Sequence, residues 1–564
     1  MGTNRKTEEK KMSMSKNIAR LAVTAGLTAA LSFGGVMAPV TMAFAAEANG
    51  SVTIENVNGN TTEFQGYQIF KADVDSGKVA NITWANDRVE KAVKDVIEKE
   101  DTSYAGKTAQ DAADWITNKV TGTNETTRVA PDNIAYKIAD AVDGLSPSAM
   151  TTSKTASGLA HGYWLFVTKT DTIGVGEAGT SPIFTVVGNT PVKITEKTGI
   201  PTVEKKIVSD ADSKEHDAAD SQIGQDVTYN LYGTVAENFD KYDTYFYQFS
   251  DKISKGLTLQ KDAKVYLYKN RTDATGTDIT MYFKEETPAK AAEDGSKTTT
   301  WTCDNLKDVS GVTKDSYIVV SYKAQINKYA VVAGTEGNEN TVTLNYSNNP
   351  MTSDRGETQS DTVKDYTYGL KINKVDLGTE AALDGAEFTI QATGADDGAS
   401  KNLYVQKDGS LGSDPWNFAT ANGGVIKVTG LDAGTYTVTE VSAPSGYAKV
   451  DPFTFEIKPN MNADDPGAGL TALKGVLTTD QGGKVIAGIT DENAGDNNLT
   501  AKLGSEKDED GIFNITVGDT KQVGLPLTGL NGVTFTWIAG GAVLCIGVAH
   551  LIRSRKQAEE SEQE

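Results

Sequence analysis

The sequence predicts a mainly β protein, with tandem antiparallel β-sandwiches that follow an N-terminal domain in which helices are inserted into a sheet. Three observations lead to this prediction. Short segments that alternate apolar and polar residues recur along the chain, as in Tyr317–Ile326. Residues typical of turns (Gly, Asp and Asn) separate these segments. Helical spacing of apolar residues occurs between Val89 and Val142.

The 564 residues leave room for about three domains of ~150 residues each between two terminal segments. We expect an N-terminal domain at 47–197, a middle β-sandwich at 198–364 and a C-terminal β-sandwich at 365–522. Residues 1–46 and 523–564 have the composition of targeting segments.

The N-terminus has the pattern of a signal peptide. Basic residues up to Arg20 precede an apolar run, Leu21 to Met42, and the run closes on Ala43-Phe44-Ala45-Ala46. Small residues at this spacing fit the site of a signal peptidase. Glycines and Pro39 interrupt the run, which argues against a membrane anchor. The chain is therefore expected to be exported, with a mature start near Ala46 or Glu47; Met12 or Met14 is an alternative first residue.

The C-terminus carries a second apolar segment with different neighbours. The pentapeptide Leu525-Pro526-Leu527-Thr528-Gly529 precedes an apolar stretch, Val533 to Ile552, and a basic cluster that begins at Arg553. The stretch has about the ~20 residues that a helix needs to cross a bilayer. The basic cluster would hold it on the cytoplasmic side.

Composition excludes several classes of function. The net charge of −22 leaves no basic surface for nucleic acid. The 3 histidines provide neither a catalytic triad nor a zinc site, so we expect no enzyme of a conventional kind and no cofactor or metal. Of the 2 cysteines, Cys545 falls in the apolar C-terminal stretch and Cys303 stands alone. An exported protein of this size without a disulfide must be stabilised in some other way.

The pentapeptide Leu525-Pro526-Leu527-Thr528-Gly529, with its apolar stretch and basic tail, resembles an LPxTG sorting signal. The resemblance implies that a sortase cysteine cleaves after Thr528 and carries the Thr528 carbonyl as a thioester. An amine of the cell wall or of a pilin lysine would then accept it.

A second resemblance, to sortase-assembled major pilins, concerns Val192-Lys193-Ile194-Thr195-Glu196-Lys197. It is similar to their V-x-V-Y-P-K motif, although Thr195 and Glu196 replace the Tyr-Pro pair. The resemblance implies that Lys197 is the amine that joins subunits, with Lys193 as the alternative. A Thr528-to-Lys197 linkage gives a head-to-tail fibre that does not close.

The third resemblance, to Cna B-type domains, begins at Gly434-Thr435-Tyr436-Thr437-Val438-Thr439-Glu440 and continues through Val441-Ser442-Ala443-Pro444-Ser445-Gly446-Tyr447, which is similar to the pilin E-box. Such domains form an isopeptide bond unaided. Strand alternation places Lys374 and Glu440 among core residues. The resemblance implies that Lys374 is the nucleophile, Glu440 the acid and Asp519 the acceptor, with Asn514 as the alternative acceptor. A buried ion pair without covalent chemistry is the competing interpretation.

The middle domain repeats this pattern. On the first strand of this domain, Lys205 lies in an alternating pattern with apolar residues. On the last strand, Asn348 continues a similar pattern. The segment around Asp251 resembles the one that supplies the acid in this family. We therefore expect Lys205, Asp251 and Asn348 to form a bond, and Lys206, Asn349 and Asn340 are alternatives. The N-terminal domain contains no convincing set.

These features favour a structural subunit of a covalent, wall-anchored surface pilus of a Gram-positive cell. The expected partners are a class C (pilin) sortase, a housekeeping sortase, other copies of the chain, minor pilins and peptidoglycan. The alternative is a monomeric wall-anchored adhesin or a minor (tip or basal) pilin. The pilus is expected to support adhesion to a host surface ligand, whose identity the sequence does not give. A wall-anchored hydrolase is disfavoured because no catalytic constellation is found.

Overall fold

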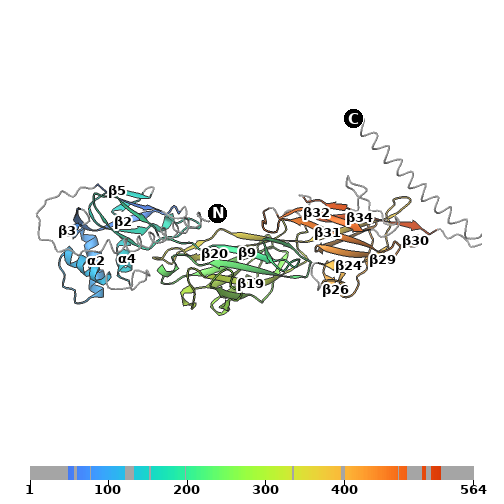
Figure 1. Ribbon diagram of the computed structural model, residues 1–564, viewed down its shortest axis with the longest axis horizontal. Helices are drawn as coiled ribbons and strands as arrows, with labels where there is room; N and C mark the ends of the chain where they lie inside the picture. The colour runs from blue at the N-terminus through green and yellow to red at the C-terminus, as the bar shows by residue number, and fades with distance from the viewer. Residues whose placement is uncertain are drawn as a thin grey trace, which may run out of the picture.

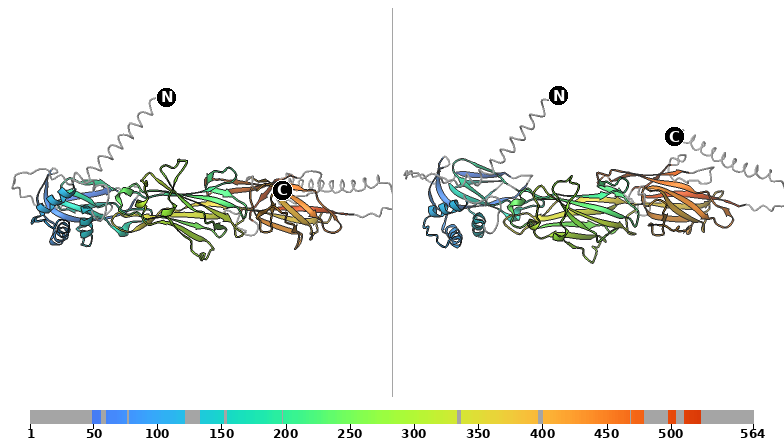
Figure 2. Two further views of the ribbon diagram at one scale, coloured as in Figure 1. Left: turned by 90° about the horizontal axis from the view of Figure 1, so that it is seen from below. Right: turned by 60° about the horizontal axis from the view of Figure 1, so that its bottom comes forward.

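The computed structural model describes residues 49–55, 60–75, 78–120, 133–151, 154–196, 198–332, 336–395, 400–467, 469–478, 498–503 and 510–522. These residues form three bodies in a row along the longest axis of the molecule (Figures 1 and 2). The α-helices of the described residues lie in the first body, and strands make up most of the other two. The predicted mainly β fold, with inserted helices near the N-terminus, is confirmed.

The predicted signal peptide, the sorting pentapeptide and the apolar stretch from Val533 to Ile552 all lie outside the described residues. Within the ranges given above, no helix is long and apolar enough to cross a membrane.

The first body combines two sheets with three helices. The smaller sheet has the order β5 (Thr155–Leu159), β1 (Gly50–Glu55), β8 (Val192–Thr195). The larger has the order β3 (Lys78–Trp84), β2 (Phe64–Asp75), β6 (Gly162–Thr168), β7 (Ile183–Val187), and β4 (Ala149–Met150) also pairs with β2. The helices are α2 (Asp87–Glu100), α3 (Ala109–Val120) and α4 (Ile134–Asp143).

Helix α2 forms where the sequence predicts a helix. The side-chain oxygen of Asn86 accepts hydrogen bonds from the first free backbone N–H groups of the helix, at 3.1 Å. Val89, Val93 and Ile97 then recur on one face and are buried against the core of the first body. Helix packing thus closes one side of the larger sheet.

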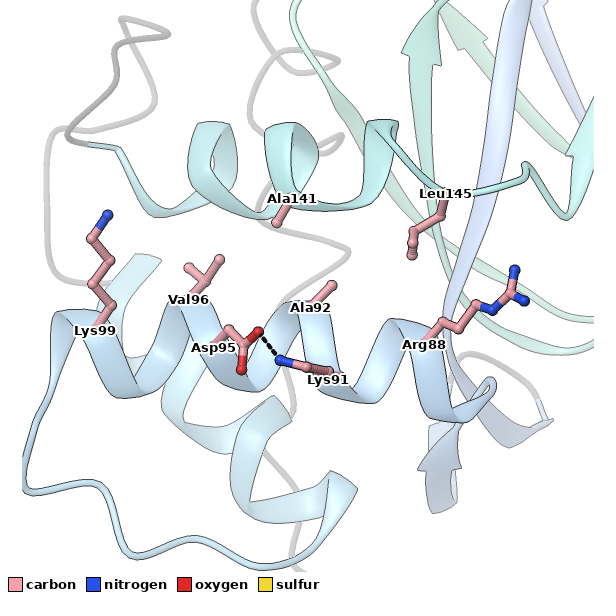
Figure 3. A pocket seen from close by; sticks show the side chains of 8 residues that line it. All are labelled: Arg88, Lys91, Ala92, Asp95, Val96, Lys99, Ala141 and Leu145. Atoms are coloured by element: carbon pink, nitrogen blue, oxygen red, sulfur yellow. Dashed lines mark hydrogen bonds and ion pairs between the residues drawn. The ribbon is translucent and has the colours of Figure 1, made fainter.

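A groove of about 430 Å³ lies between α2 and α4, and Figure 3 shows the side chains that line it. They are Arg88, Lys91, Ala92, Asp95, Val96, Lys99, Ala141 and Leu145. The polar members are exposed, and two of them, Lys91 and Asp95, form a surface ion pair at 2.5 Å. The groove therefore offers no desolvated polar group for chemistry.

The middle body is a sandwich of two sheets. The first has the order β10 (Glu215–His216), β9 (Val203–Val208), β12 (Asp226–Thr234), β19 (Tyr317–Ile326), β15 (Lys264–Tyr268), β16 (Thr277–Asp278), and β14 (Leu257–Leu259) also pairs with β19. The second has the order β11 (Ala218–Asp220), β22 (Asp361–Tyr366), β20 (Asn338–Ser347), β13 (Tyr247–Ile253), β18 (Lys297–Cys303), β17 (Lys284–Glu286), and β21 (Arg355–Glu357) also pairs with β20. Cys303 is a free, buried thiol in this body.

The third body is also a sandwich. Its smaller sheet has the order β28 (Val425–Leu431), β23 (Tyr368–Asp376), β34 (Ile512–Lys521), β30 (Tyr447–Ala448). The larger has the order β26 (Leu411–Gly412), β25 (Tyr404–Val405), β24 (Glu387–Ala395), β29 (Gly434–Ser442), β31 (Phe453–Met461), β32 (Leu470–Thr478), β33 (Asn498–Ala501), and β27 (Phe418–Ala419) also pairs with β24. The first strand of this body, β23, runs parallel to the last, β34, although most other pairs are antiparallel. The two ends of the domain therefore lie side by side.

Hydrogen bonds join the first body to the middle one. The backbone N–H of Gly179 donates to the carbonyl of Asn348 at 2.6 Å, and the Tyr346 hydroxyl donates to the carbonyl of Glu177 at 3.4 Å. Met351 of the middle body packs against the core of the first. These hydrogen bonds and this packing contact form an interface, or seam, between the first and middle bodies.

A second seam joins the middle body to the third. The backbone N–H of Ile223 donates to the carbonyl of Gly430 at 3.0 Å. The buried side-chain oxygen of Gln222 accepts a hydrogen bond from the backbone N–H of Asp432 at 3.2 Å. The segment between β11 and β12 thus reaches into the third body.

Candidate functional sites

The first candidate site lies between the two sheets of the third body. Parallel pairing of β23 with β34 places Lys374 opposite Val517, so Asp519, two residues further, lies on the same face of the sheet. Glu440 comes from β29 in the other sheet. The side chains of Lys374, Glu440 and Asp519 are completely buried. The structure therefore brings together the three residues that the sequence predicts.

The contacts within this cluster are direct. Lys374 Nζ lies 3.1 Å from Glu440 Oε1 and donates a hydrogen bond to Asp519 Oδ1. Glu440 Oε2 accepts a hydrogen bond from the backbone N–H of Val450 at 2.8 Å, which fixes the carboxyl group. Burial raises the pKa of both carboxyl groups, because a low dielectric disfavours their charged form.

Because burial raises the pKa of both carboxyl groups, each can hold a proton in this cluster. The neutral form of an amine is its nucleophilic form. The amine already contacts the Asp519 carboxyl group, so the reacting groups are preassembled. This arrangement can condense an amine with a carboxylic acid.

Asn514, the alternative acceptor, is not part of the cluster. It pairs with Lys371 across β23 and β34 and is half-buried. Because it is an odd number of residues from Asp519 along the strand, its side chain lies on the opposite face of the sheet.

The second candidate site lies in the middle body and contains four side chains. β9 and β19 of one sheet supply Lys205 and Tyr322, and β13 and β20 of the other supply Asp251 and Asn340. None of the four is more than 1 % exposed. The lysine and the acid are those that the sequence predicts. Asn340 is one of the alternative acceptors, and Tyr322 is a residue that the sequence did not indicate.

The Tyr322 hydroxyl group is at the centre of this second cluster. Lys205 Nζ donates hydrogen bonds to Asp251 Oδ1 and, at 3.1 Å, to the Tyr322 oxygen. The Tyr322 hydroxyl donates to Asp251 Oδ2 at 2.5 Å and accepts from Asn340 Nδ2 at 2.7 Å. An amine, an acid and a side-chain amide therefore meet around one phenol oxygen.

Burial governs the charge of Lys205. Desolvation lowers its pKa from the usual 10.5 to about 8, although the charge of Asp251 acts in the opposite direction. A lysine with this pKa has a substantial neutral population near physiological pH. The neutral amine is the form that attacks a carbonyl group.

Asn348, the predicted acceptor, lies in the seam between the first and middle bodies, where its carbonyl oxygen accepts from Gly179. At ~3.3 Å per residue, it is roughly 26 Å along the chain from Asn340. The side chain of Asn349 is also engaged locally, because its oxygen accepts from the backbone N–H of Met351 at 3.0 Å. The structure places Asn340, and not Asn348, beside the Lys205 cluster.

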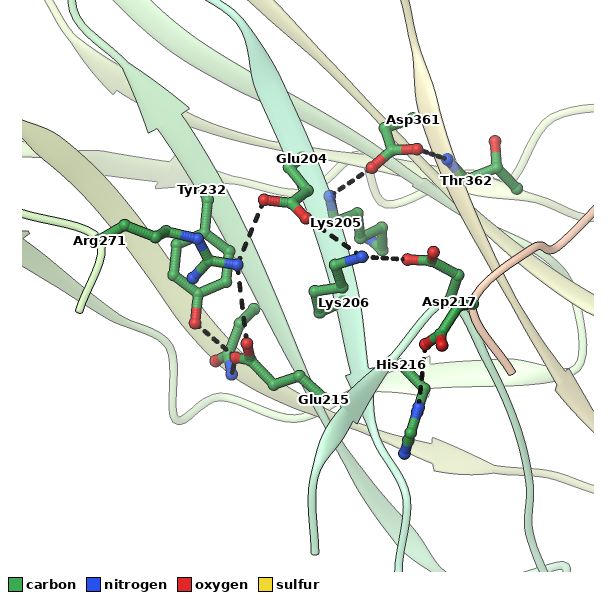
Figure 4. Close-up of polar contacts among 12 residues, drawn as sticks. Glu204, Lys205, Lys206, Glu215, His216, Asp217, Tyr232, Arg271, Asp361 and Thr362 are labelled. Atoms are coloured by element: carbon green, nitrogen blue, oxygen red, sulfur yellow. Dashed lines mark hydrogen bonds and ion pairs between the residues drawn. The ribbon is translucent and has the colours of Figure 1, made fainter. Parts of the chain in front are cut away.

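Lys206, the alternative nucleophile, lies on the outer face of β9. Figure 4 shows its amine between two carboxyl groups, 2.6 Å from Asp217 Oδ1 and 3.1 Å from Glu204 Oε1. In the same view the backbone N–H of Lys205 donates to Asp361 at 2.6 Å. Lys206 is 20 % exposed. Partial burial acts to lower its pKa, but the contacts with Asp217 and Glu204 outweigh this effect and raise the pKa, so the charged amine is favoured.

Lys205 and Lys374 are the only lysines buried within the part of the chain that the structure describes. Among the described residues of the first body, no lysine is buried.

The residues proposed for linkage between subunits are less fully described. Lys197 and the sorting pentapeptide lie outside the described residues. Lys193, on β8, is 73 % exposed, and its amine lies 3.7 Å from Glu55. Since β8 ends at Thr195 and β9 begins at Val203, Lys197 falls in the connection between the first and middle bodies.

Residues 368–465 match a family model described as SpaA, prealbumin-like fold domain. The third body thus resembles a prealbumin-like domain. This match covers the strands that carry Lys374 and Glu440 and ends before Asp519. The search of curated proteins found no match.

The chain is also similar to solved structures of pilins. For the T6 backbone pilin of Streptococcus pyogenes serotype M6, the identity is 17 %, the comparison covers 86 % of this chain and 100 % of that one, and the TM-score is 0.49. For the major pilin SpaD of Corynebacterium diphtheriae, the identity is 18 %, the comparison covers 84 % of this chain and 98 % of that one, and the TM-score is 0.45. For the major pilin SpaA of the same organism, the identity is 12 %, the comparison covers 84 % of this chain and 100 % of that one, and the TM-score is 0.40.

The lowered pKa of Lys205 predicts that stability depends on pH in a variant that cannot form the isopeptide bond expected for this lysine. In Asn340→Ala, the unfolded state binds the lysine proton more tightly than the folded state between about pH 8 and pH 10.5. The free energy of unfolding should therefore rise with pH across this window, by roughly 2–3 kcal/mol. Urea unfolding at a series of pH values measures this change. The control Asn340→Ala/Lys205→Met should lack this increment, and identical pH profiles for the two variants would contradict the prediction.

Proposed function

We propose that this chain is a structural subunit of a covalent surface pilus. A sortase would join the Thr528 carbonyl of one copy to the Lys197 amine of the next and finally attach the fibre to peptidoglycan. The observation that carries the proposal is the presence of a buried lysine, an acid and a carbonyl side chain in each of two successive bodies, in a chain whose residues 525–529 resemble a sorting pentapeptide.

The proposed chemistry in the third body is a condensation between Lys374 and Asp519. The Lys374 nitrogen attacks the Asp519 carboxyl carbon, a C–N bond forms, and the carboxyl hydroxyl leaves as water. Glu440 holds the proton that the reaction needs and polarises the carbonyl group. The contacts of Lys374 with both acids support this assignment.

In the middle body, we assign Asn340 rather than Asn348 as the acceptor for Lys205, and Asp251 as the acid. Attack of the Lys205 nitrogen on the side-chain carbon of Asn340 forms the same type of bond and releases ammonia. The shared contact of Lys205 and Asn340 with one hydroxyl group supports this choice.

Such bonds would serve a fibre in two ways. Each would close a long loop and so restrict the conformations of the unfolded chain. By analogy with disulfides, this restriction stabilises the folded domain by about 4–5 kcal/mol. Each also provides a covalent path for tension, because β9 and β23 are the first strands of their bodies and β20 and β34 are late or last ones.

The connection that contains Lys197 is a suitable place for the link between subunits. It lies between bodies, and a link from there to the C-terminus of another copy repeats without closure. The chain would act as the substrate of the sortase and would itself turn over no small molecule.

Replacement of Lys197 with Ala or Arg should abolish the high-mass ladder that wall extracts of producing cells show on an immunoblot. The amine that accepts the Thr528 thioester is then absent, so a single band at monomer mass is expected. Lys193→Ala is the matched control and should preserve the ladder. A ladder that persists in the Lys197 variants would exclude that residue, whereas a single band for the unmodified chain would indicate a monomeric wall-anchored adhesin.

The proposed bonds change the mass of the mature chain, even when the chain is produced without any sortase. Condensation of Lys374 with Asp519 should lower the mass by about 18 Da, because water leaves. The bond in the middle body should lower it by a further amount of about 17 Da, because ammonia leaves. Intact-mass measurement with peptide mapping resolves the two. Glu440→Ala should restore the first increment alone. If the folded wild-type chain has its unmodified mass, the clusters are buried ion pairs and the chemistry proposed here is wrong.

A further inference from the structure

The Tyr322 hydroxyl group touches both nitrogen atoms that change bonding in the proposed middle-body reaction. Its oxygen is 3.1 Å from Lys205 Nζ, which must lose a proton, and 2.7 Å from Asn340 Nδ2, which must gain one. It also contacts the acid, Asp251, at 2.5 Å. No other hydroxyl group among the described residues forms hydrogen bonds with both nitrogens.

Two aromatic rings stack on the ring of Tyr322. Tyr229 stacks on it at a centroid distance of 5.6 Å and an interplanar angle of 20°, and Trp301 stacks at 5.3 Å and 29°. Tyr322 itself is 1 % exposed. Because two other rings stack on it and the side chain is buried, the hydroxyl group of Tyr322 is positioned at the reacting groups before the bond forms.

An amide nitrogen leaves a tetrahedral carbon readily only after it has taken up a proton, so the reaction needs a donor at Asn340 Nδ2. We propose that Tyr322 is a catalytic residue that passes this proton from the lysine nitrogen to the departing ammonia. The proposal rests on the bond assigned above to Lys205 and Asn340.

The step balances without any other reactant. The Lys205 Nζ–Asn340 Cγ bond forms and the Asn340 Cγ–Nδ2 bond breaks. The Nζ atom gives one proton to the phenol oxygen while the phenol gives its own proton to Nδ2, so ammonia departs and Tyr322 is unchanged. Burial raises the pKa of Tyr322 well above its usual value, which disfavours a free tyrosinate and favours transfer of both protons together.

The third body provides a contrast within the same chain. There Lys374 contacts two acids directly, and the ring near its amine is that of Phe388, at 5.4 Å, which has no hydroxyl group. The proposed acceptor in the third body is the carboxyl group of Asp519, and Glu440 can act as the acid for it. A phenol is thus found in the cluster whose proposed acceptor is an amide, and not in the cluster whose proposed acceptor is a carboxyl group.

The test compares Tyr322→Phe with Tyr229→Phe in the mature chain. Both changes remove one buried hydroxyl group from the same aromatic stack, but the Tyr229 hydroxyl donates to Asp365 at 3.3 Å and touches neither reacting nitrogen. After pulse labelling, timed samples are analysed by intact mass and peptide mapping for the middle-body bond. Loss of a positioned proton donor should slow this bond on the order of 10²-fold in Tyr322→Phe. Tyr229→Phe and the third-body bond should form at the wild-type rate.

Two further readouts separate catalysis from structure. The rate deficit of Tyr322→Phe should be the same factor from pH 6 to about pH 9, whereas a shifted lysine pKa would move the profile along the pH axis. In a Lys205→Met background, which cannot form the bond, the two Phe variants should unfold at similar urea concentrations. If the middle-body bond forms at the same rate in both Phe variants, the relay is wrong. It is also wrong if the slower bond formation in Tyr322→Phe is matched by a loss of stability in the Lys205→Met background. Absence of the middle-body bond in the wild type would instead refute the proposed function.

Discussion

The architecture depends on two lysine amines that the fold removes from water. Transfer of an ammonium group into a protein interior costs several kcal/mol, even when a carboxyl group lies beside it. Both clusters are located between facing sheets, where their side chains are buried. The proposed bonds would convert each amine to a neutral amide nitrogen and so remove any buried charge permanently. For Lys205, the burial that lowers the pKa of the amine also favours its nucleophilic form.

The order of the bodies agrees with this constraint. In the proposed fibre, tension enters at Lys197 and leaves at Thr528, so it passes through the middle and third bodies and bypasses the first. The two bodies in this path contain the buried lysines, and the described part of the first contains none. The seams at Gly179 and Gln222 join neighbouring bodies by hydrogen bonds, which limits their independent motion without a further covalent bond.

The third-body cluster was predicted because its members lie on regular strands and because their motifs resemble Cna B-type domains. Alternation places Lys374, Glu440 and Asp519 toward the core, and the parallel register of β23 and β34 then brings Lys374 and Asp519 together. In the middle body, alternation places Asn340 and Asn348 on the same face of one strand and cannot choose between them. The choice depends on the register between β13 and β20, where Asn340 pairs with Ile253, and no local signal encodes this register.

Tyr322 was not predictable for a related reason. It stands in Tyr317–Ile326, where it continues the apolar alternation of a core strand, and its role becomes visible only when the other sheet supplies Asp251 and Asn340. The helices of the first body, by contrast, were predictable, since spacing and capping are local properties.

In the proposed fibre, covalent bonds carry tension through the middle and third bodies. This can be measured by force spectroscopy on the mature chain, held through cysteines introduced at Lys197 and Gln522. If both bonds form, the sequence between Lys205 and Asn340 and that between Lys374 and Asp519 should not be released, while the double variant Asn340→Ala/Asp519→Ala should unfold in both bodies. Two long extensions in the wild-type chain, each on the order of 500 Å at ~3.5 Å per residue, would show that neither bond carries the load.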